Sequence, residues 1–134
     1  MIDSLAAEAA CTRLIFQFAA ANDARRWEDA AALFVEDGLF ARPTAPDQPV
    51  VGRTAILAAF QARPPRLTRH VVSNVIVTTE SETEAHAHSL IQLYLEDENG
   101  QAKPPLIGEF HDRLVLVMAG WRFRERRGAL IFRS

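Results

Sequence analysis

The amino-acid sequence predicts a single α+β domain over residues 1–134, in which helices from the first half pack against a curved antiparallel sheet from the second half. Two observations lead to this prediction. Apolar residues recur with a helical period of 3.6 before Pro65 and with a strand period of two after it. The chain of 134 residues is long enough for one hydrophobic core and too short for two ordinary domains.

Three helices and one short strand are expected in the first half of the chain. The helices cover residues 4–21, 27–35 and 54–63, and the strand covers residues 39–42. Asp3 or Ser4 can cap the first helix, and Asn22 with Asp23 interrupts the helical pattern before the second. Thr54 can cap the third helix, which Pro64 must end.

The second half of the chain predicts four long strands. They cover residues 69–79, 84–95, 106–118 and 121–132, each rich in β-branched or aromatic residues. Short turn-forming segments separate them, including the glycine-containing stretches 97–100 and 119–120. Connections this short join neighbouring antiparallel strands, so the sheet is expected to be antiparallel.

Composition and charge exclude several classes of protein. The net charge of −2 does not provide the positive field that sequence-independent nucleic-acid binding needs, so no nucleic-acid partner is expected. No apolar run approaches the roughly 20 residues of a membrane helix, and the acidic N-terminus does not resemble a secretory signal. The single cysteine, Cys11, cannot form an internal disulfide. We therefore expect a cytoplasmic protein without a membrane partner.

Asp23 and His70 are the leading candidates for chemistry. Asp23 stands four residues before Trp27, one helical turn from a large aromatic ring. His70 begins a strand in which the period of two places Asn74 on the same face. A carboxylate paired with a histidine holds one tautomer ready as a base. The alternatives are that Asp23 caps the second helix and that His70 is a buried structural histidine.

A second group of ionisable residues raises the possibility of a metal site. His86 and His88 share one strand face, and Glu109 and His111 share a face of the next strand. The glycine and glutamate spacing that usually follows such a histidine pair is missing, so no metal is expected. Glycine-rich phosphate loops and dinucleotide fingerprints are also absent from the sequence, and no cofactor is expected.

Two strand faces are expected to be exposed. Arg122, Arg124 and Arg126 alternate along the last strand and so predict a solvent or oligomer face. The convex face of the sheet is expected to be apolar and to form a homodimer. The residues assigned to that face are Val71, Val75, Val77, Ile91, Leu93, Val115 and Val117.

Six short segments resemble the nuclear transport factor 2-like cone, and within it the SnoaL-like branch. They are residues 23–28, 33–38, 52–56, 68–70, 110–115 and 120–123, and together with the element order they cover nearly the whole chain. The resemblance implies a cone-shaped fold, with three helices packed in the curved sheet.

The resemblance also implies the residues of a site. Scytalone dehydratase, one member of this superfamily, matches best at Asp23 and His70, which would be the catalytic pair. The tyrosine that precedes the aspartate in that enzyme is Asn22 here. A pocket is expected around the pair, lined by Phe18, Asn22, Phe40, Asn74, His88, Tyr94, Phe110 and His111.

The function implied is a cofactor-independent enzyme or binder for a small hydrophobic molecule. A hydroxylated aromatic, polyketide or terpenoid-like compound would undergo dehydration, isomerisation or cyclisation by acid–base chemistry of His70 and Asp23. The alternative is a non-catalytic accessory subunit that resembles the small subunit of ring-hydroxylating dioxygenases, a group that shares this fold.

Overall fold

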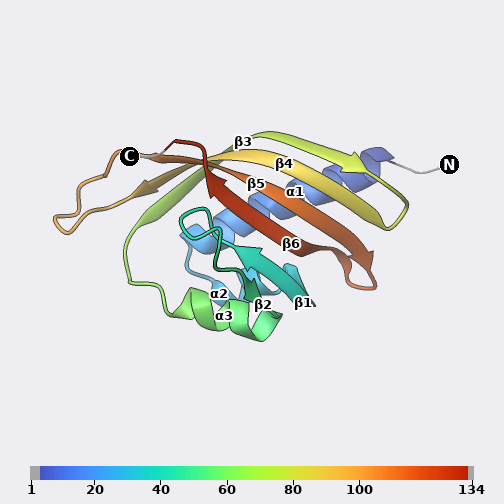
Figure 1. The fold of residues 1–134 in the computed structure, drawn as a ribbon, viewed down its shortest axis with the longest axis horizontal. Coiled ribbons are helices and arrows are strands. Elements are labelled where there is room, and N and C mark those ends of the chain that lie inside the picture. Colours follow the sequence, from blue (N-terminus) through green and yellow to red (C-terminus); the bar gives the residue numbers. More distant parts are fainter. Residues whose placement is uncertain (1–3, 133–134) are drawn as a thin grey trace.

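A computed structural model describes residues 4–132 of the protein (Figure 1). Three helices and six strands follow one another along the chain. In order they are α1 (Ser4–Asp23), α2 (Trp27–Ala31), β1 (Phe34–Ala41), β2 (Val50–Val51), α3 (Arg53–Gln61), β3 (Thr68–Thr79), β4 (Glu84–Leu95), β5 (Leu106–Val117) and β6 (Gly120–Leu130). The α+β class and the four long strands of the second half are confirmed.

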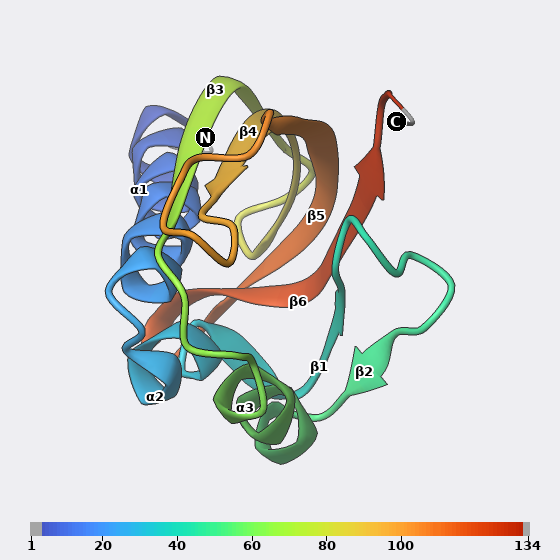
Figure 2. The same ribbon diagram turned by 90° about the vertical axis from the view of Figure 1, so that its left-hand side faces the viewer.

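The six strands form one curved sheet in the order β2-β1-β6-β5-β4-β3. All neighbours pair antiparallel except β1 and β6, which are parallel, so the sheet is mixed rather than wholly antiparallel as expected. Helix α1 lies against β3, while α2 and α3 lie together near β1 (Figure 2). The sheet and the helices thus enclose an interior.

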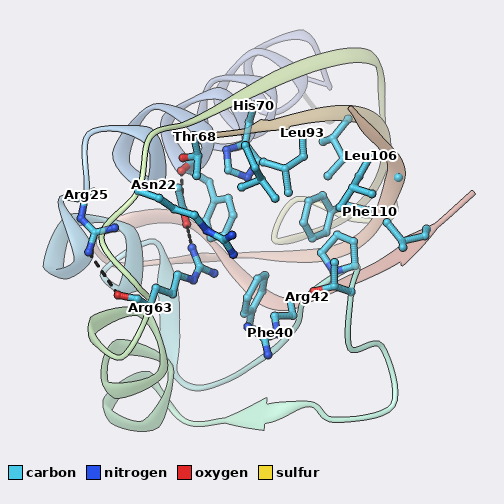
Figure 3. A pocket seen from close by; sticks show the side chains of 18 of the residues that line it. Asn22, Arg25, Phe40, Arg42, Arg63, Thr68, His70, Leu93, Leu106 and Phe110 are labelled. Atoms are coloured by element: carbon cyan, nitrogen blue, oxygen red, sulfur yellow. Dashed lines mark hydrogen bonds between the residues drawn. The ribbon is translucent and has the colours of Figure 1, made fainter. Parts of the chain in front are cut away.

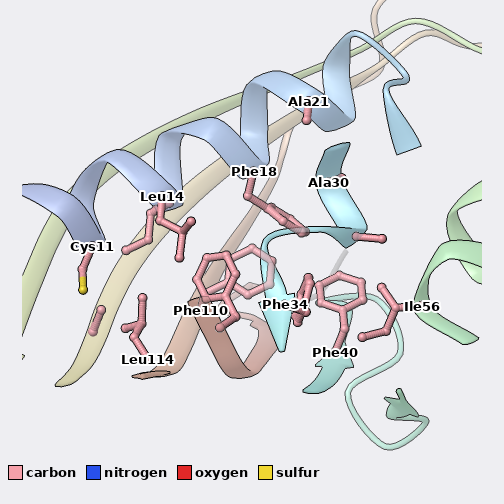
Figure 4. Close-up of a cluster of buried hydrophobic side chains, with 14 of the residues drawn as sticks. Cys11, Leu14, Phe18, Ala21, Ala30, Phe34, Phe40, Ile56, Phe110 and Leu114 are labelled. Atoms are coloured by element: carbon pink, nitrogen blue, oxygen red, sulfur yellow. The ribbon is translucent and has the colours of Figure 1, made fainter. Parts of the chain in front are cut away.

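Phenylalanine rings fill the centre of that interior (Figure 4). Phe18 on α1 lies within 6.3 Å, centroid to centroid, of the rings of Phe34, Phe40, Phe60, Phe110 and Phe123. All six rings are buried. Aromatic pairs at such distances add to the stabilisation from area burial, so this cluster ties α1 and α3 to the sheet.

The strand β1 begins earlier than the sequence predicts. The second helix ends at Ala31 instead of Val35, and β1 starts at Phe34 instead of Leu39. Phe34 pairs with Phe123 of β6, and the Phe123 amide donates to the Leu33 carbonyl at 2.8 Å. A short apolar segment fits the helical period of 3.6 and the strand period of two equally well. Here the pairing with the distant strand β6 selects the strand.

A β-bulge divides β3 and reverses which side chains of its second half face the core. The register against β4 shifts between Ser73 and Ile76, and Asn74 has a left-handed backbone with φ of 52°. Val75 and Val77 therefore pack against the core, whereas Asn74 and Ile76 are exposed. The expectation that Asn74 shares the inward face of His70 is wrong for this reason.

A second irregularity has the same effect in β6. The register against β5 shifts between Arg113 and Leu114, so that Arg124 has no paired residue. Glu125 then faces outward and Arg126 faces inward, where its side chain is 1% exposed. The prediction that Arg126 lies on a solvent face with Arg122 and Arg124 is wrong, because a strict period of two does not continue through a bulge.

The convex face of the sheet is more polar than expected. Of the apolar residues assigned to it, Val75, Val77 and Ile91 belong to the interior, and Leu93 lines a cavity. Val71 and Val117 are exposed. The homodimer stays a prediction. No helix among residues 4–132 has the length and apolar character needed to cross a membrane.

Candidate functional site

A cavity of about 170 Å³ opens between the end of α1, the concave side of the sheet and the segment that joins α3 to β3 (Figure 3). An apolar cavity of about 150 Å³ accepts a benzene ring, so this one has room for a small ring compound. Its apolar wall consists of Phe18, Trp27, Phe40, Ile91, Leu93, Leu95, Leu106, Phe110 and Leu130.

Gly128 lets the chain after β1 pack close to the cavity, because a Cβ atom there would lie 2.7 Å from atoms of Pro43. Gly108, which also lines the cavity, is restricted by β6, because a Cβ atom there would lie 2.9 Å from the Ala129 carbonyl oxygen. No side chain larger than hydrogen fits at such distances. Because Pro43 packs directly against Gly128, its neighbours Arg42 and Thr44 are held at the cavity wall.

Asp23 and His70 meet at one side of this cavity, although they are 47 positions apart in the sequence. His70 Nδ1 lies 2.6 Å from Asp23 Oδ1. The His70 backbone N–H donates to Asp23 Oδ2 at 2.8 Å, and the Thr68 hydroxyl donates to Oδ1 at 3.0 Å. Because α1 ends at Asp23 and β3 starts at Thr68, the pair forms where the two elements meet.

These contacts determine how the pair is protonated. Burial acts to raise the pKa of the Asp23 carboxyl, but the hydrogen bonds from the His70 ring and amide, the His70 charge and the Thr68 hydroxyl hold that pKa below its usual range. An ionised carboxylate only accepts hydrogen bonds, so the His70 Nδ1 carries a proton. In neutral His70 the other ring nitrogen, Nε2, is then free of a proton and available to accept one.

The alternative role of Asp23 as a helix cap is wrong. The N-cap position of α2 is Arg26, which makes no side-chain capping bond. The carboxylate oxygens of Asp23 bond to Thr68 and His70 instead.

The structure divides the residues predicted to line the pocket into two groups. Phe18, Asn22, Phe40 and Phe110 line the cavity together with His70. Asn74, His88, Tyr94 and His111 are not among the lining residues. Asn74 is turned outward by the bulge, and the other three occupy the outer face because the odd-numbered residues of β4 and the even-numbered residues near Phe110 on β5 face inward. His111 follows this alternation and is exposed.

The outer face carries its own cluster of ionisable groups. The Nε2 atoms of His88 and His111 lie 2.8 and 2.9 Å from the same Glu109 Oε1, and donor atoms of all three lie within 4.8 Å of one another. The hydrogen bond from His88, followed by that from His111 and the charges of both rings, lowers the pKa of the Glu109 carboxyl despite some desolvation. Two imidazoles and a carboxylate are suitable metal ligands, but mutual hydrogen bonds already satisfy them. The absence of a metal stays a prediction.

Four arginines at the cavity were not predicted. Arg25, Arg42, Arg63 and Arg66 all line it. Their positions follow no helix or strand period, because they lie in the connections between elements. The one local signal is the Arg63-Pro64-Pro65-Arg66 segment, in which prolines hold two arginines in an extended chain.

A buried ion pair behind the cavity was also missed. Arg126 Nη1 donates to Asp112 Oδ2 at 2.6 Å, and the guanidinium carbon lies 3.7 Å from the centroid of the Phe110 ring. Burial raises the pKa of the Asp112 carboxyl to about 6, although Arg126 acts in the opposite direction. Among the described residues, Asp112 Oδ1, Arg126 Nε and Ser89 Oγ have no hydrogen-bond partner.

A curved sheet that wraps around its helices and encloses a cavity defines a cone-shaped α+β fold. The chain belongs to the family of SnoaL-like domains, whose model matches residues 3–127. None of the curated proteins matches the sequence.

Solved structures support the same assignment. A candidate scytalone dehydratase from Novosphingobium aromaticivorans is 28% identical, with a TM-score of 0.84 over 96% of this chain and 87% of that protein. A nuclear transport factor 2-like protein with a cystatin-like fold from the same organism is 22% identical, with a TM-score of 0.80 over 94% and 82%. A candidate aromatic ring hydroxylase, also from that organism, is 19% identical, with a TM-score of 0.81 over 94% and 90%. The last two show the likeness of fold alone.

Proposed function

We propose that the protein is a cofactor-independent acid–base enzyme acting on a small hydrophobic, hydroxylated ring compound. The observation that carries this proposal is the His70–Asp23 pair, with His70 lining an otherwise largely apolar cavity. An apolar pocket with a few convergent polar groups is the usual form of a small-molecule site. The likeness to a candidate scytalone dehydratase agrees with it.

In the proposed reaction, His70 acts as the base. Its Nε2 takes a proton from a carbon next to a carbonyl group, and Asp23 holds the ring in position and stabilises the imidazolium that forms. In a dehydration, the bond between the adjacent carbon and its hydroxyl group then breaks. The hydroxyl leaves as water with a proton returned by His70, and a carbon–carbon double bond remains. In an isomerisation the same proton is returned to a different carbon.

Both routes share proton abstraction, which can be measured before the natural substrate is known. Bicyclic β-hydroxy ketones are incubated with the protein in D₂O, and deuterium incorporation next to the carbonyl is followed by NMR. We expect exchange above the buffer rate, and a reduction of about 10²- to 10⁴-fold in His70→Gln, because a positioned base contributes about that factor. His86→Gln is the matched control, since His86 is exposed on the outer face and pairs with Glu80.

Exchange by His70→Gln at the rate of the unaltered protein would contradict the proposed base. Exchange at the buffer rate for every ketone would contradict the proposal that the protein is an acid–base enzyme. The second outcome would favour the accessory-subunit role, in which the same fold supports a larger partner.

A further inference from the structure

The cavity has a strongly positive mouth. Arg25, Arg42 and Arg63 line it (Figure 3). Arg66 lines it too, and no aspartate or glutamate is among its described lining residues. The four arginines come from the turn after α1, the end of β1, the segment after α3 and the approach to β3. Three separate connections thus bring positive charge to one opening, in a protein whose net charge is −2.

Arg63 lies deepest of the four. Its guanidinium donates to the side-chain oxygen of the buried Asn22 and lies 4.6 Å from the Phe60 ring centroid and 5.3 Å from that of Trp27. Burial, with the nearby charges of Arg42 and Arg25, lowers the pKa of Arg63 to about 10. Arg63 therefore remains a cation at neutral pH.

No carboxylate among the described residues neutralises these cations. Within residues 4–132 none of the four arginines forms an ion pair, whereas the buried Arg126 has Asp112. Arg25 donates to the backbone carbonyls of Pro64 and Arg63. A desolvated cation without an anion is costly, so this arrangement is suited to an anion that enters from outside.

The backbone restrains two of these arginines. Arg25 has a left-handed φ of 56°, uncommon for a residue other than glycine, and its N–H donates to the Asn22 carbonyl at 3.0 Å. Pro43, seated on Gly128, fixes the chain next to Arg42. Holding the chain in position before binding reduces the entropy lost when a ligand is bound.

We propose that the ligand of this cavity is a ring compound that carries a carboxylate, with the carboxylate bound by Arg63 and Arg42 and the ring packed against Phe40 and Phe110. A planar guanidinium matches a carboxylate with two parallel hydrogen bonds. This inference rests on the proposed function, because it concerns the same cavity. It adds that the substrate is an anion held at the mouth while its ring extends toward His70.

Two probes of nearly the same size and shape, one an anion and one neutral, test the inference. The affinities of 1-naphthoate and neutral 1-naphthamide are measured by isothermal titration calorimetry on the full chain at pH 7. We expect 1-naphthoate to bind at least about tenfold tighter, as charge-assisted hydrogen bonds require. We also expect its advantage to shrink with added salt, which screens the arginines at the open mouth.

Arginine variants assign the effect to the mouth. We expect Arg42→Gln and Arg63→Gln each to weaken binding of 1-naphthoate by about tenfold while leaving that of the amide unchanged. Arg69→Gln is the matched control, because Arg69 is exposed on β3 and does not line the cavity. Arg63 packs on Trp27 and Phe60, so its replacement can also weaken the fold; Arg42 is exposed and makes no such ring contact, and its variant keeps the test decisive.

Three outcomes would overturn the inference: equal affinity for the two probes, no binding of 1-naphthoate, or an undiminished preference in both Arg42→Gln and Arg63→Gln. Each leaves the deuterium-exchange experiment unaffected. His70-dependent exchange together with equal probe affinities would retain the proposed enzyme and reject its anionic substrate.

Discussion

Two aspartates beside ionisable partners differ in the direction of their carboxyl pKa. Asp23, whose side chain is 14% exposed, accepts bonds from His70 and Thr68, and its pKa is lowered. Asp112, fully buried, has one oxygen bonded to Arg126 and one without a partner, and its pKa is raised to about 6. Burial raises the pKa of Asp112 despite its cation, whereas at Asp23 the accepted hydrogen bonds outweigh burial, so a neighbouring cation alone does not set the direction.

The two pairs also differ in where they lie. His70 contacts Asp23 and lines the cavity, so the imidazole ring is accessible from that space. Arg126 lies among the rings of Phe18, Phe110 and Phe123 and is not among the residues that line the cavity.

The largest effect is expected from removing one member of the buried pair. Asp112→Ala removes the oxygen that accepts from Arg126 Nη1, an acceptor that even the protonated acid keeps, and this should cost about 3–5 kcal/mol of unfolding free energy. Urea denaturation at pH 7 measures it, with the exposed Asp37→Ala as control. The double variant Asp112→Leu with Arg126→Met should recover most of the loss. A loss below about 1 kcal/mol in the single variant would show that the contact between Asp112 and Arg126 contributes little to the stability of the core.

A smaller effect is expected from pH. Because the pKa of Asp112 is higher in the folded protein than its ordinary value of 3.8, the folded state takes up its proton first as pH falls. The contribution of Asp112 to stability is thus fully present below 3.8 and lost as pH rises through about 6. Relative to Asp112→Asn, the protein should gain up to about 3 kcal/mol between pH 7 and pH 4. A gain on raising the pH instead would reverse the assigned sign.

The smallest effect, of opposite sign, is expected at Asp23. Its lowered pKa means that the carboxylate stabilises the fold above the unfolded value near 3.9 and that this contribution is lost as pH falls through the lower folded value. Asp23→Asn should cost about 1–2 kcal/mol at pH 7. The deficit should shrink on acidification, as followed by urea denaturation across the same pH range. A deficit that is constant with pH would mean that the hydrogen bonds to Asp23 do not depend on its charge.

The sequence predicts where helices and strands lie better than it predicts which of their side chains face the core. The long strands follow from a period of two and from glycine-containing turns, which are local signals. The outward turn of Asn74 and the inward turn of Arg126 depend on bulges, which are set by pairing with β4 and β5 and leave no mark in the alternation. The early start of β1 at Phe34 depends likewise on its parallel partner β6.

The candidate site shows the same division. Asp23 and His70 were found because a family resemblance supplied the long-range pairing that spacing alone cannot give. The mouth arginines were missed because Arg25, Arg42 and Arg63 lie in connections, where side-chain direction depends on how the ends of distant elements are arranged. The relevant signal, an excess of arginine in several loops, acquires meaning only when those loops are known to converge.

The extra residue at Asn74 has a consequence for how the protein can change over evolutionary time. It divides β3 into two segments of independent phase, one that presents His70 to the cavity and one that presents Val75 and Val77 to the core. Substitutions around His70 can therefore reshape the cavity wall without shifting the packing beyond the bulge. Deleting a single residue there would exchange inside for outside along half of the strand, so this position should resist length variation that the hairpin between β3 and β4 tolerates.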